Sequence, residues 1–149
     1  MLTRLMRHFT HLGDARSWVF VGLVLLAVGS VETTSLARLL AFGAGGAALL
    51  AQALKRMSGR RRPSDGIADF EALAANPDAF SFPSGHTAAA VAVAVAWAGE
   101  GMVLGPLATA FAVAVGFSRV YLGAHYPLDV GAGVLLGLVG GVLARVLGG

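Results

Sequence analysis

Long apolar stretches, separated by short polar segments, make up most of this chain of 149 residues. Hydrophobic residues account for 56% of the sequence and charged residues for 13%, and the mean hydropathy is +0.75. A water-soluble domain of this length has too little interior to bury so much apolar surface. The composition therefore predicts a single integral membrane domain over residues 1–149, whose 21 glycines allow helices to pack closely.

The apolar stretches predict an all-α helical bundle with about five transmembrane helices. The third stretch alternates like a strand, but an unpaired strand cannot cross lipid, so a helix is the better interpretation. Several stretches are shorter than the ~20 residues that a full crossing takes, and the third would need a tilted or thinned arrangement. The expected spans cover residues 15–31, 36–55, 85–99, 102–120 and 127–147.

An amphipathic segment precedes the first span. In residues 2–12 one helical face is apolar and the other is basic, which predicts a helix lying in the headgroup layer, with a frayed terminus as the alternative. The span over residues 15–31 resembles a signal peptide, and we expect it to remain as a membrane anchor.

Three glycines recur every four residues in the last span: Gly133, Gly137 and Gly141. They form a flat stripe on which another helix can pack. We expect this stripe to pack within the chain, and a subunit interface is the alternative.

Composition also excludes several kinds of site. The chain has no cysteine, which rules out disulfides, thiolate metal sites and cysteine nucleophiles. The pI is near 10.2, but the basic residues cluster at the ends of apolar segments. Membrane orientation and phosphate binding therefore explain the positive charge better than a nucleic-acid partner does.

Three polar clusters are expected on one side of the membrane, because counting the spans places their loops there. They are residues 55–63, 83–86 and 118–129. Lys55, Arg62 and Arg119 would supply one compact charge and two planar guanidinium groups, a combination that suits a phosphate group. We interpret Arg60 and Arg61 as flanking charge that orients the membrane domain, and the same role is the alternative to phosphate binding for Lys55 and Arg62.

The sequence Pro-Ser-Gly-His at residues 83–86 has features of a helix start that binds an anion. Ser84 is expected to be the N-cap, and Gly85 lets the backbone approach a ligand. His86 would stand in the first turn, with a ring that donates a proton near neutral pH, although a structural histidine is the alternative.

His125 and Asp129 lie four residues apart, so they share a face if the backbone is helical from about Tyr126 onward. The carboxylate would hold one ring nitrogen protonated and leave the other free to attack phosphorus. A surface contact is the alternative for an isolated pair, but charged groups near a membrane are costly without a role.

At these positions the sequence resembles the type 2 phosphatidic acid phosphatase (PAP2) superfamily, which pairs membrane lipid phosphatases with soluble vanadium haloperoxidases. The shared pattern is a lysine, six residues and Arg-Pro; then Pro-Ser-Gly-His; then Ser-Arg, five residues, His, three residues and Asp. All of it is present, from Lys55 to Asp129. Membrane members commonly have six spans, one more than the number expected here.

The resemblance implies a role for each matching residue. His125 would be the nucleophile that forms a phosphohistidine, Asp129 would orient it, and His86 would protonate the leaving alkoxide and then activate water. The phosphate oxygens would be bound by Lys55, Arg62, Ser84, Gly85 and Arg119. Proteins of this pattern need no metal and no cofactor.

The expected activity is hydrolysis of a lipid phosphate held in the bilayer. Candidate substrates are phosphatidic acid, phosphatidylglycerol phosphate, a polyprenyl (pyro)phosphate and decaprenyl-phosphoribose phosphate. Alternatives are a vanadate-dependent haloperoxidase, a phosphotransferase, and a non-catalytic subunit that binds anionic lipid. The excess of arginine on the site's side predicts a cytoplasm-facing site in a bacterial inner membrane.

Overall fold

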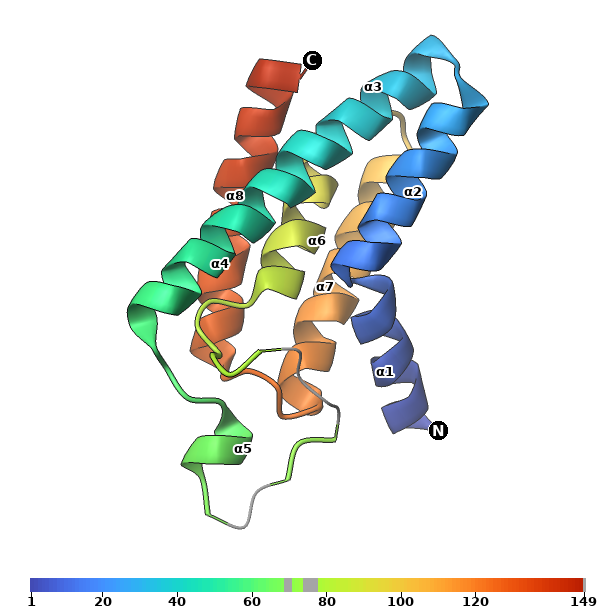
Figure 1. Ribbon diagram of the computed structural model, residues 1–149. Coiled ribbons are helices and arrows are strands. Elements are labelled where there is room, and N and C mark those ends of the chain that lie inside the picture. Colours follow the sequence, from blue (N-terminus) through green and yellow to red (C-terminus); the bar gives the residue numbers. More distant parts are fainter. Residues whose placement is uncertain (69–70, 74–77, 149) are drawn as a thin grey trace.

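The computed structural model describes residues 1–68, 71–73 and 78–148, and the regular elements within them are helices (Figure 1). A π-helical turn, η1 (Ala41–Gly45), joins α3 and α4 into one continuous helix. The α-helices in chain order are α1 (Leu2–Leu12), α2 (Ala15–Val28), α3 (Val31–Leu40), α4 (Gly46–Ser58), α5 (Pro63–Gly66), α6 (Gly85–Ala96), α7 (Leu104–Tyr121) and α8 (Pro127–Gly148).

Within the described residues, three helices are long and apolar enough to cross a membrane: Val31–Ser58, α7 and α8. The pair α1 and α2 passes the same test together, although it is bent by 58°. The apolar helix α6 has only 12 residues. The all-α membrane bundle is thus confirmed, whereas the count of about five spans stays a prediction, because α2 and α6 are shorter than their apolar stretches.

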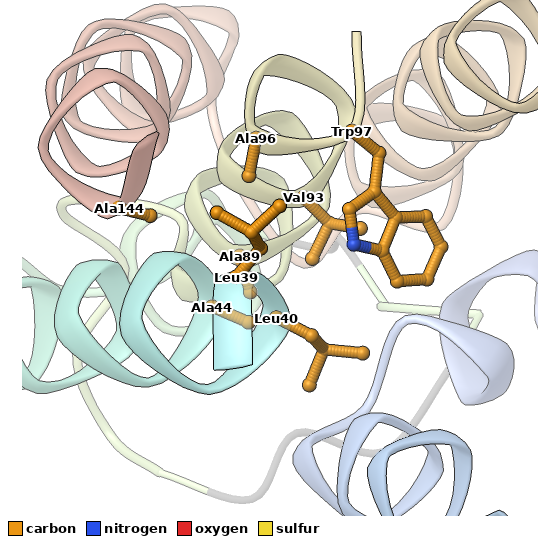
Figure 2. Packing of buried hydrophobic residues seen from close by; sticks show 8 residues of the cluster. All are labelled: Leu39, Leu40, Ala44, Ala89, Val93, Ala96, Trp97 and Ala144. Atoms are coloured by element: carbon orange, nitrogen blue, oxygen red, sulfur yellow. The ribbon is translucent and has the colours of Figure 1, made fainter. Parts of the chain in front are cut away.

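Helix α6 occupies the centre of the bundle and is the most enclosed element. It contacts α7, α8, α4 and α3, and eight of its residues are buried. Most of these are alanines, whose small side chains let the surrounding helices come close. Figure 2 shows one side of this core, where Ala89 and Val93 of α6 lie beside Leu39 and Leu40 of α3.

The glycine stripe of α8 packs against α6, which confirms the expectation that it packs within the chain. A Cβ atom added at Gly137 would lie 2.6 Å from Val91 Cβ, and one added at Gly141 would lie 2.5 Å from Val95 Cβ. At Gly133 the added atom would lie 2.6 Å from the backbone oxygen of Ser84. The glycines therefore set the distance between α8 and α6.

The amphipathic N-terminal helix is confirmed, and it lies against α7. Met6 and Thr10 are buried, and the Thr10 hydroxyl is 2.9 Å from the Ser118 hydroxyl. Leu2 and Leu5 remain exposed. The position of α1 in a headgroup layer stays a prediction, but the helix also forms one wall of the polar end of the bundle.

All the polar clusters lie at one end of the molecule. The C-terminal ends of α4 and α7 and the N-terminal ends of α6 and α8 meet there, and the chain's N-terminus lies at the same end (Figure 1). The turn between α2 and α3 lies at the opposite end, as does the C-terminus. This arrangement agrees with the side of the membrane that the sequence assigns to each loop.

The close contact between α8 and α6 predicts a difference between two glycines of α8. In Gly137→Ala the new methyl group would overlap Val91, so we expect a loss of about 1–3 kcal/mol of stability. Gly131→Ala is the control, since nothing lies within 4 Å of a Cβ at that position. Thermal unfolding in detergent compares the two, and equal midpoints would contradict this packing.

Candidate active site

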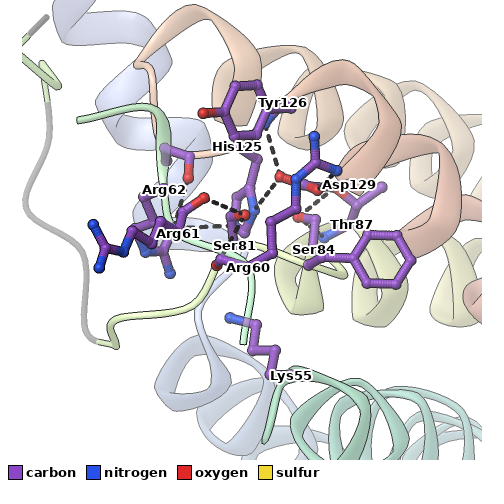
Figure 3. Close-up of polar contacts among 12 residues, drawn as sticks. Lys55, Arg60, Arg61, Arg62, Ser81, Ser84, Thr87, His125, Tyr126 and Asp129 are labelled. Atoms are coloured by element: carbon purple, nitrogen blue, oxygen red, sulfur yellow. Dashed lines mark hydrogen bonds and ion pairs between the residues drawn. The ribbon is translucent and has the colours of Figure 1, made fainter. Parts of the chain in front are cut away.

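The structure brings the residues of the three predicted clusters together at the polar end of the bundle (Figure 3). Lys55 comes from the end of α4 and Arg62 from the residue that precedes α5. Ser84, Gly85 and His86 come from the start of α6, and Arg119 from the end of α7. His125 lies in the loop before α8, and Asp129 in the first turn of that helix.

Lys55 and Arg62 hold a carboxylate between them. Lys55 Nζ donates to Asp78 Oδ2 at 2.7 Å, and Arg62 Nη2 donates to Asp78 Oδ1 at 2.5 Å. Arg62 Nε also donates to the Asp78 backbone oxygen at 2.8 Å. Burial alone would raise the pKa of Asp78, but these hydrogen bonds outweigh it and keep the pKa below its ordinary value. The two cations thus already bind an anion in the way that they would bind phosphate oxygens.

Arg119 completes the cationic cluster from α7. It is almost completely buried, and Nη1 lies 3.4 Å from the Thr10 hydroxyl of α1, which accepts its hydrogen bond. Arg119 interacts electrostatically with Lys55, Arg62 and Asp78. Arg119 therefore adds a third positive charge that acts on Lys55 and Arg62, and an ion with several negative oxygens would be stabilised by the three together.

The His125 ring lies beside these cations with its two nitrogens in different surroundings. Nε2 is 3.5 Å from Arg62 Nη1, and the same Nη1 donates to the backbone oxygen of Ala124 at 2.7 Å. Nδ1 is 3.8 Å from Asp129 Oδ2, which is within ion-pair range but longer than a direct hydrogen bond. Among the described residues, buried Nδ1 has no hydrogen-bond partner. The ring therefore presents Nε2 toward the cationic cluster.

Burial and the neighbouring cations keep the His125 ring neutral. Burial lowers its pKa to about 4, and Arg119, Arg62 and Lys55 act in the same direction, while Asp129 opposes them. A neutral imidazole retains the lone pair that a nucleophile requires.

Asp129 is fixed by two donors as well as by its helix. Its Oδ2 accepts the backbone N–H of Tyr126 at 2.9 Å, and its Oδ1 accepts Arg60 Nη1 at 2.9 Å. The Arg60 guanidinium also lies 4.5 Å from the centre of the Tyr126 ring (Figure 3). Arg60 thus has a contact that its interpretation as flanking charge did not include, since it forms an ion pair with a buried carboxylate.

The start of α6 has the predicted cap. Ser84 is the N-cap and accepts the backbone N–H of Thr87, and its hydroxyl lies 2.9 Å from that of Thr87. The backbone N–H of Ser84 donates to the Asp129 backbone oxygen at 2.9 Å, which joins the α6 and α8 starts directly. The phosphate-binding roles of Ser84 and Gly85 remain predictions.

His86 has a partner that its motif does not contain. Its Nε2 lies 2.6 Å from Oδ1 of Asp14, in the corner between α1 and α2. Asp14 is therefore a site residue that sequence reasoning missed, together with Asp78 and Arg60. No spacing rule connects Asp14 or Asp78 to the motifs, whereas Arg60 lies two residues before Arg62 and was available as a candidate.

Comparison with known proteins identifies the family and the fold. The model of the PAP2 superfamily matches residues 36–148. This chain belongs to the PAP2 superfamily. It is 34% identical over 151 residues to the decaprenylphosphoryl-5-phosphoribose phosphatase of Mycobacterium tuberculosis, covering 96% of this chain and 78% of the relative.

Two solved structures share the fold of this PAP2 protein. One is the transmembrane PAP2-type phosphatidylglycerolphosphate phosphatase of Bacillus subtilis, with a TM-score of 0.75 and 30% identity, covering 97% of this chain and 75% of that one. The other is LpxE of Aquifex aeolicus, with a TM-score of 0.79 and 26% identity, covering 96% and 84%. The transmembrane Bacillus subtilis neighbour and the apolar helices of this chain together support an integral membrane protein with several spans.

The ion pair between Arg60 and Asp129 predicts that two adjacent arginines differ in importance. Arg60→Ala removes the ion-pair partner of the buried Asp129 carboxylate, which keeps its hydrogen bond from the Tyr126 N–H, so we expect a loss of about 1–3 kcal/mol of stability. Arg61→Ala is the matched control, because that side chain is exposed. Thermal unfolding in detergent measures both, and an Arg61 variant as unstable as the Arg60 variant would contradict the assignment.

Proposed function

We propose that this protein is a metal-independent, membrane-embedded phosphatase that hydrolyses a lipid or polyprenyl phosphate through a phosphohistidine. One observation carries the proposal: the three polar clusters meet at one end of the bundle (Figure 3), where Lys55 and His86 line the polar end of an apolar cavity. His125 and Arg119 both act electrostatically on His86. The family membership and the names of the relatives point to the same chemistry.

The cavity supplies a place for the lipid chain. It has a volume of about 430 Å³ and lies between α2 and the continuous helix formed by α3, η1 and α4. Apolar side chains such as Trp18, Leu23 and Leu40 line most of it, and Lys55 and His86 line its polar end. A lipid in this cavity would place its phosphate on the cationic cluster while its chain stays in an apolar environment.

The phosphate would displace the Asp78 carboxylate from Lys55 and Arg62. Nε2 of His125 would then attack phosphorus, forming a P–N bond as the P–O bond to the lipid breaks. His86 would give its proton to the departing oxygen. In the second step His86 would take a proton from water, whose oxygen attacks phosphorus and releases inorganic phosphate and free His125.

The proposed substrate is a membrane lipid phosphate, and the names of two similar proteins indicate two kinds of lipid headgroup. The Mycobacterium tuberculosis relative is named for decaprenylphosphoryl-5-phosphoribose, and the Bacillus subtilis structure for phosphatidylglycerolphosphate. An apolar cavity distinguishes chains far less sharply than a polar site distinguishes headgroups. A panel of lipid phosphates with different headgroups is therefore the discriminating measurement.

The site is proposed to face the cytoplasm of a bacterial inner membrane. The support is the excess of arginine at the end of the bundle that holds the site, including Arg4, Arg7 and Arg56, because basic residues favour the cytoplasmic side. Haloperoxidase activity is less well supported, since this chain carries a largely apolar exposed surface that suits lipid.

The nucleophile assignment predicts that His125→Ala abolishes phosphate release from every lipid phosphate that the parent protein hydrolyses. Without the imidazole no phosphohistidine can form. His8→Ala is the matched control, because His8 is exposed on α1. Phosphate release by purified protein in detergent gives the rates.

The same assay tests the rest of the mechanism. We expect orthovanadate to inhibit, as a mimic of five-coordinate phosphorus, and excess chelator to leave the rate unchanged. Undiminished release by His125→Ala would rule out this nucleophile, and a strict metal requirement would contradict the metal-free mechanism.

The lowered pKa of His125 predicts a titration far from the ordinary value. With a pKa of about 4, the ring is neutral above about pH 4 and becomes protonated, and inactive as a nucleophile, as the pH falls below it. NMR titration of histidine-labelled protein measures this directly, with the His125 signal identified by its loss in His125→Ala. A midpoint near 6.5, the ordinary value, would contradict the proposed environment.

A further inference from the structure

His86, the expected proton donor, contacts the carboxylate of Asp14, which lies outside every predicted motif. Nε2 of His86 is 2.6 Å from Oδ1 of Asp14, and 72 positions separate the two residues in the chain. Asp14 belongs to the corner between α1 and α2, which carries none of the motif residues. The contact is therefore a product of the tertiary fold.

The corner that carries Asp14 is braced on both sides. The Ser17 hydroxyl donates to the His11 backbone oxygen at 2.8 Å, and Trp18 Nε1 donates to the Gly13 backbone oxygen at 3.1 Å. These bonds cross the 58° bend between α1 and α2. The bend thus has a fixed geometry, and it directs the Asp14 carboxylate toward the start of α6.

The surroundings of His86 explain what the Asp14 carboxylate contributes. Burial of the His86 ring disfavours its protonated form, and the charges of Arg119 in α7 and of His125 in the loop before α8 act in the same direction. A general acid must carry its proton when the leaving oxygen departs. Asp14 is the anionic group that opposes these effects, and it favours the protonated ring through its hydrogen bond and its charge.

We propose that Asp14 is a positioning residue for the acid–base histidine. Its carboxylate accepts the Nε2 proton of His86, which stabilises the imidazolium and fixes the ring. Nδ1 is then the nitrogen that gives its proton to the departing lipid oxygen and takes one from water in the next step. This role rests on the proposed phosphatase function, to which it adds a second carboxylate–imidazole pair beside Asp129 and His125.

The test compares two leaving groups in Asp14→Asn. Octyl phosphate releases an alkoxide that needs protonation, whereas p-nitrophenyl phosphate releases a phenolate that leaves without it. The quantity to measure is kcat/KM, because it excludes the later hydrolysis of the phosphohistidine. Asparagine suits the N-cap position that Asp14 holds on α2, so the helix start is retained.

The expected result is a selective loss. General acid catalysis contributes about 10²–10⁴-fold, so we expect kcat/KM for octyl phosphate to fall by at least about 10-fold in Asp14→Asn. For p-nitrophenyl phosphate kcat/KM should change by less than about 3-fold, because its leaving group needs little protonation by the general acid. Asp14→Glu, which restores a carboxylate, should recover part of the activity on octyl phosphate.

The pH profile supplies a second readout. For octyl phosphate, the decline of kcat/KM at high pH should begin at a lower pH in Asp14→Asn, because Arg119 and His125 then act on His86 without an opposing anion. Asp65→Asn is the matched control, since Asp65 is exposed and its side chain contacts Ser64. It should leave both substrates and the profile unchanged.

Three results would overturn the role of Asp14. Equal losses on both substrates, with an unshifted profile, would mean that Asp14 only supports the fold or the phosphate site. Unchanged activity on octyl phosphate would mean that His86 works without it. A parent protein that releases phosphate from neither substrate would contradict the phosphatase function itself, and with it the role of Asp14.

Discussion

The concentration of positive charge in a small buried volume is the constraint on which the polar end of this molecule depends. Lys55, Arg62 and Arg119 repel one another, and burial deprives them of water. Each cation or imidazole is accordingly close to a carboxylate or a polar oxygen. Asp78 forms ion pairs with Lys55 and Arg62. Thr10 accepts a hydrogen bond from Arg119, and Asp14 contacts the ring of His86. The site is therefore a balanced network from several helices, which only the complete fold assembles.

Much of this arrangement could be predicted from the sequence, for identifiable reasons. Apolar stretches specify helices in a membrane, because a lipid-exposed backbone must satisfy its own hydrogen bonds. The motif residues from Lys55 to Pro63 and from Ser118 to Asp129 are close in sequence. Their relative positions are therefore set by local turns and helix ends, which the sequence pattern predicts. The glycine stripe predicted a close helix contact, and α6 provides it.

The remaining features depend on tertiary geometry that no local pattern encodes. Asp14 and Asp78 are single acidic residues in segments without a motif, and their roles come from a braced corner and a loop that brings them to the cations. Arg60 was assigned to membrane orientation, because its neighbours Arg61 and Arg62 have the same charge. Only the position of Asp129 separates Arg60 from Arg61. The lengths of α2 and α6 likewise depend on where the chain turns, which hydropathy does not specify.

The carboxylate of Asp78 has a consequence for the end of the reaction cycle. It binds the cations that would hold the inorganic phosphate product, so that product must compete with an anion tethered to the same chain. A tethered competitor acts at a high effective concentration. On the proposed mechanism, its return would expel the product and leave the cations neutralised, so the vacant pocket would not retain stray anions from the surrounding solution.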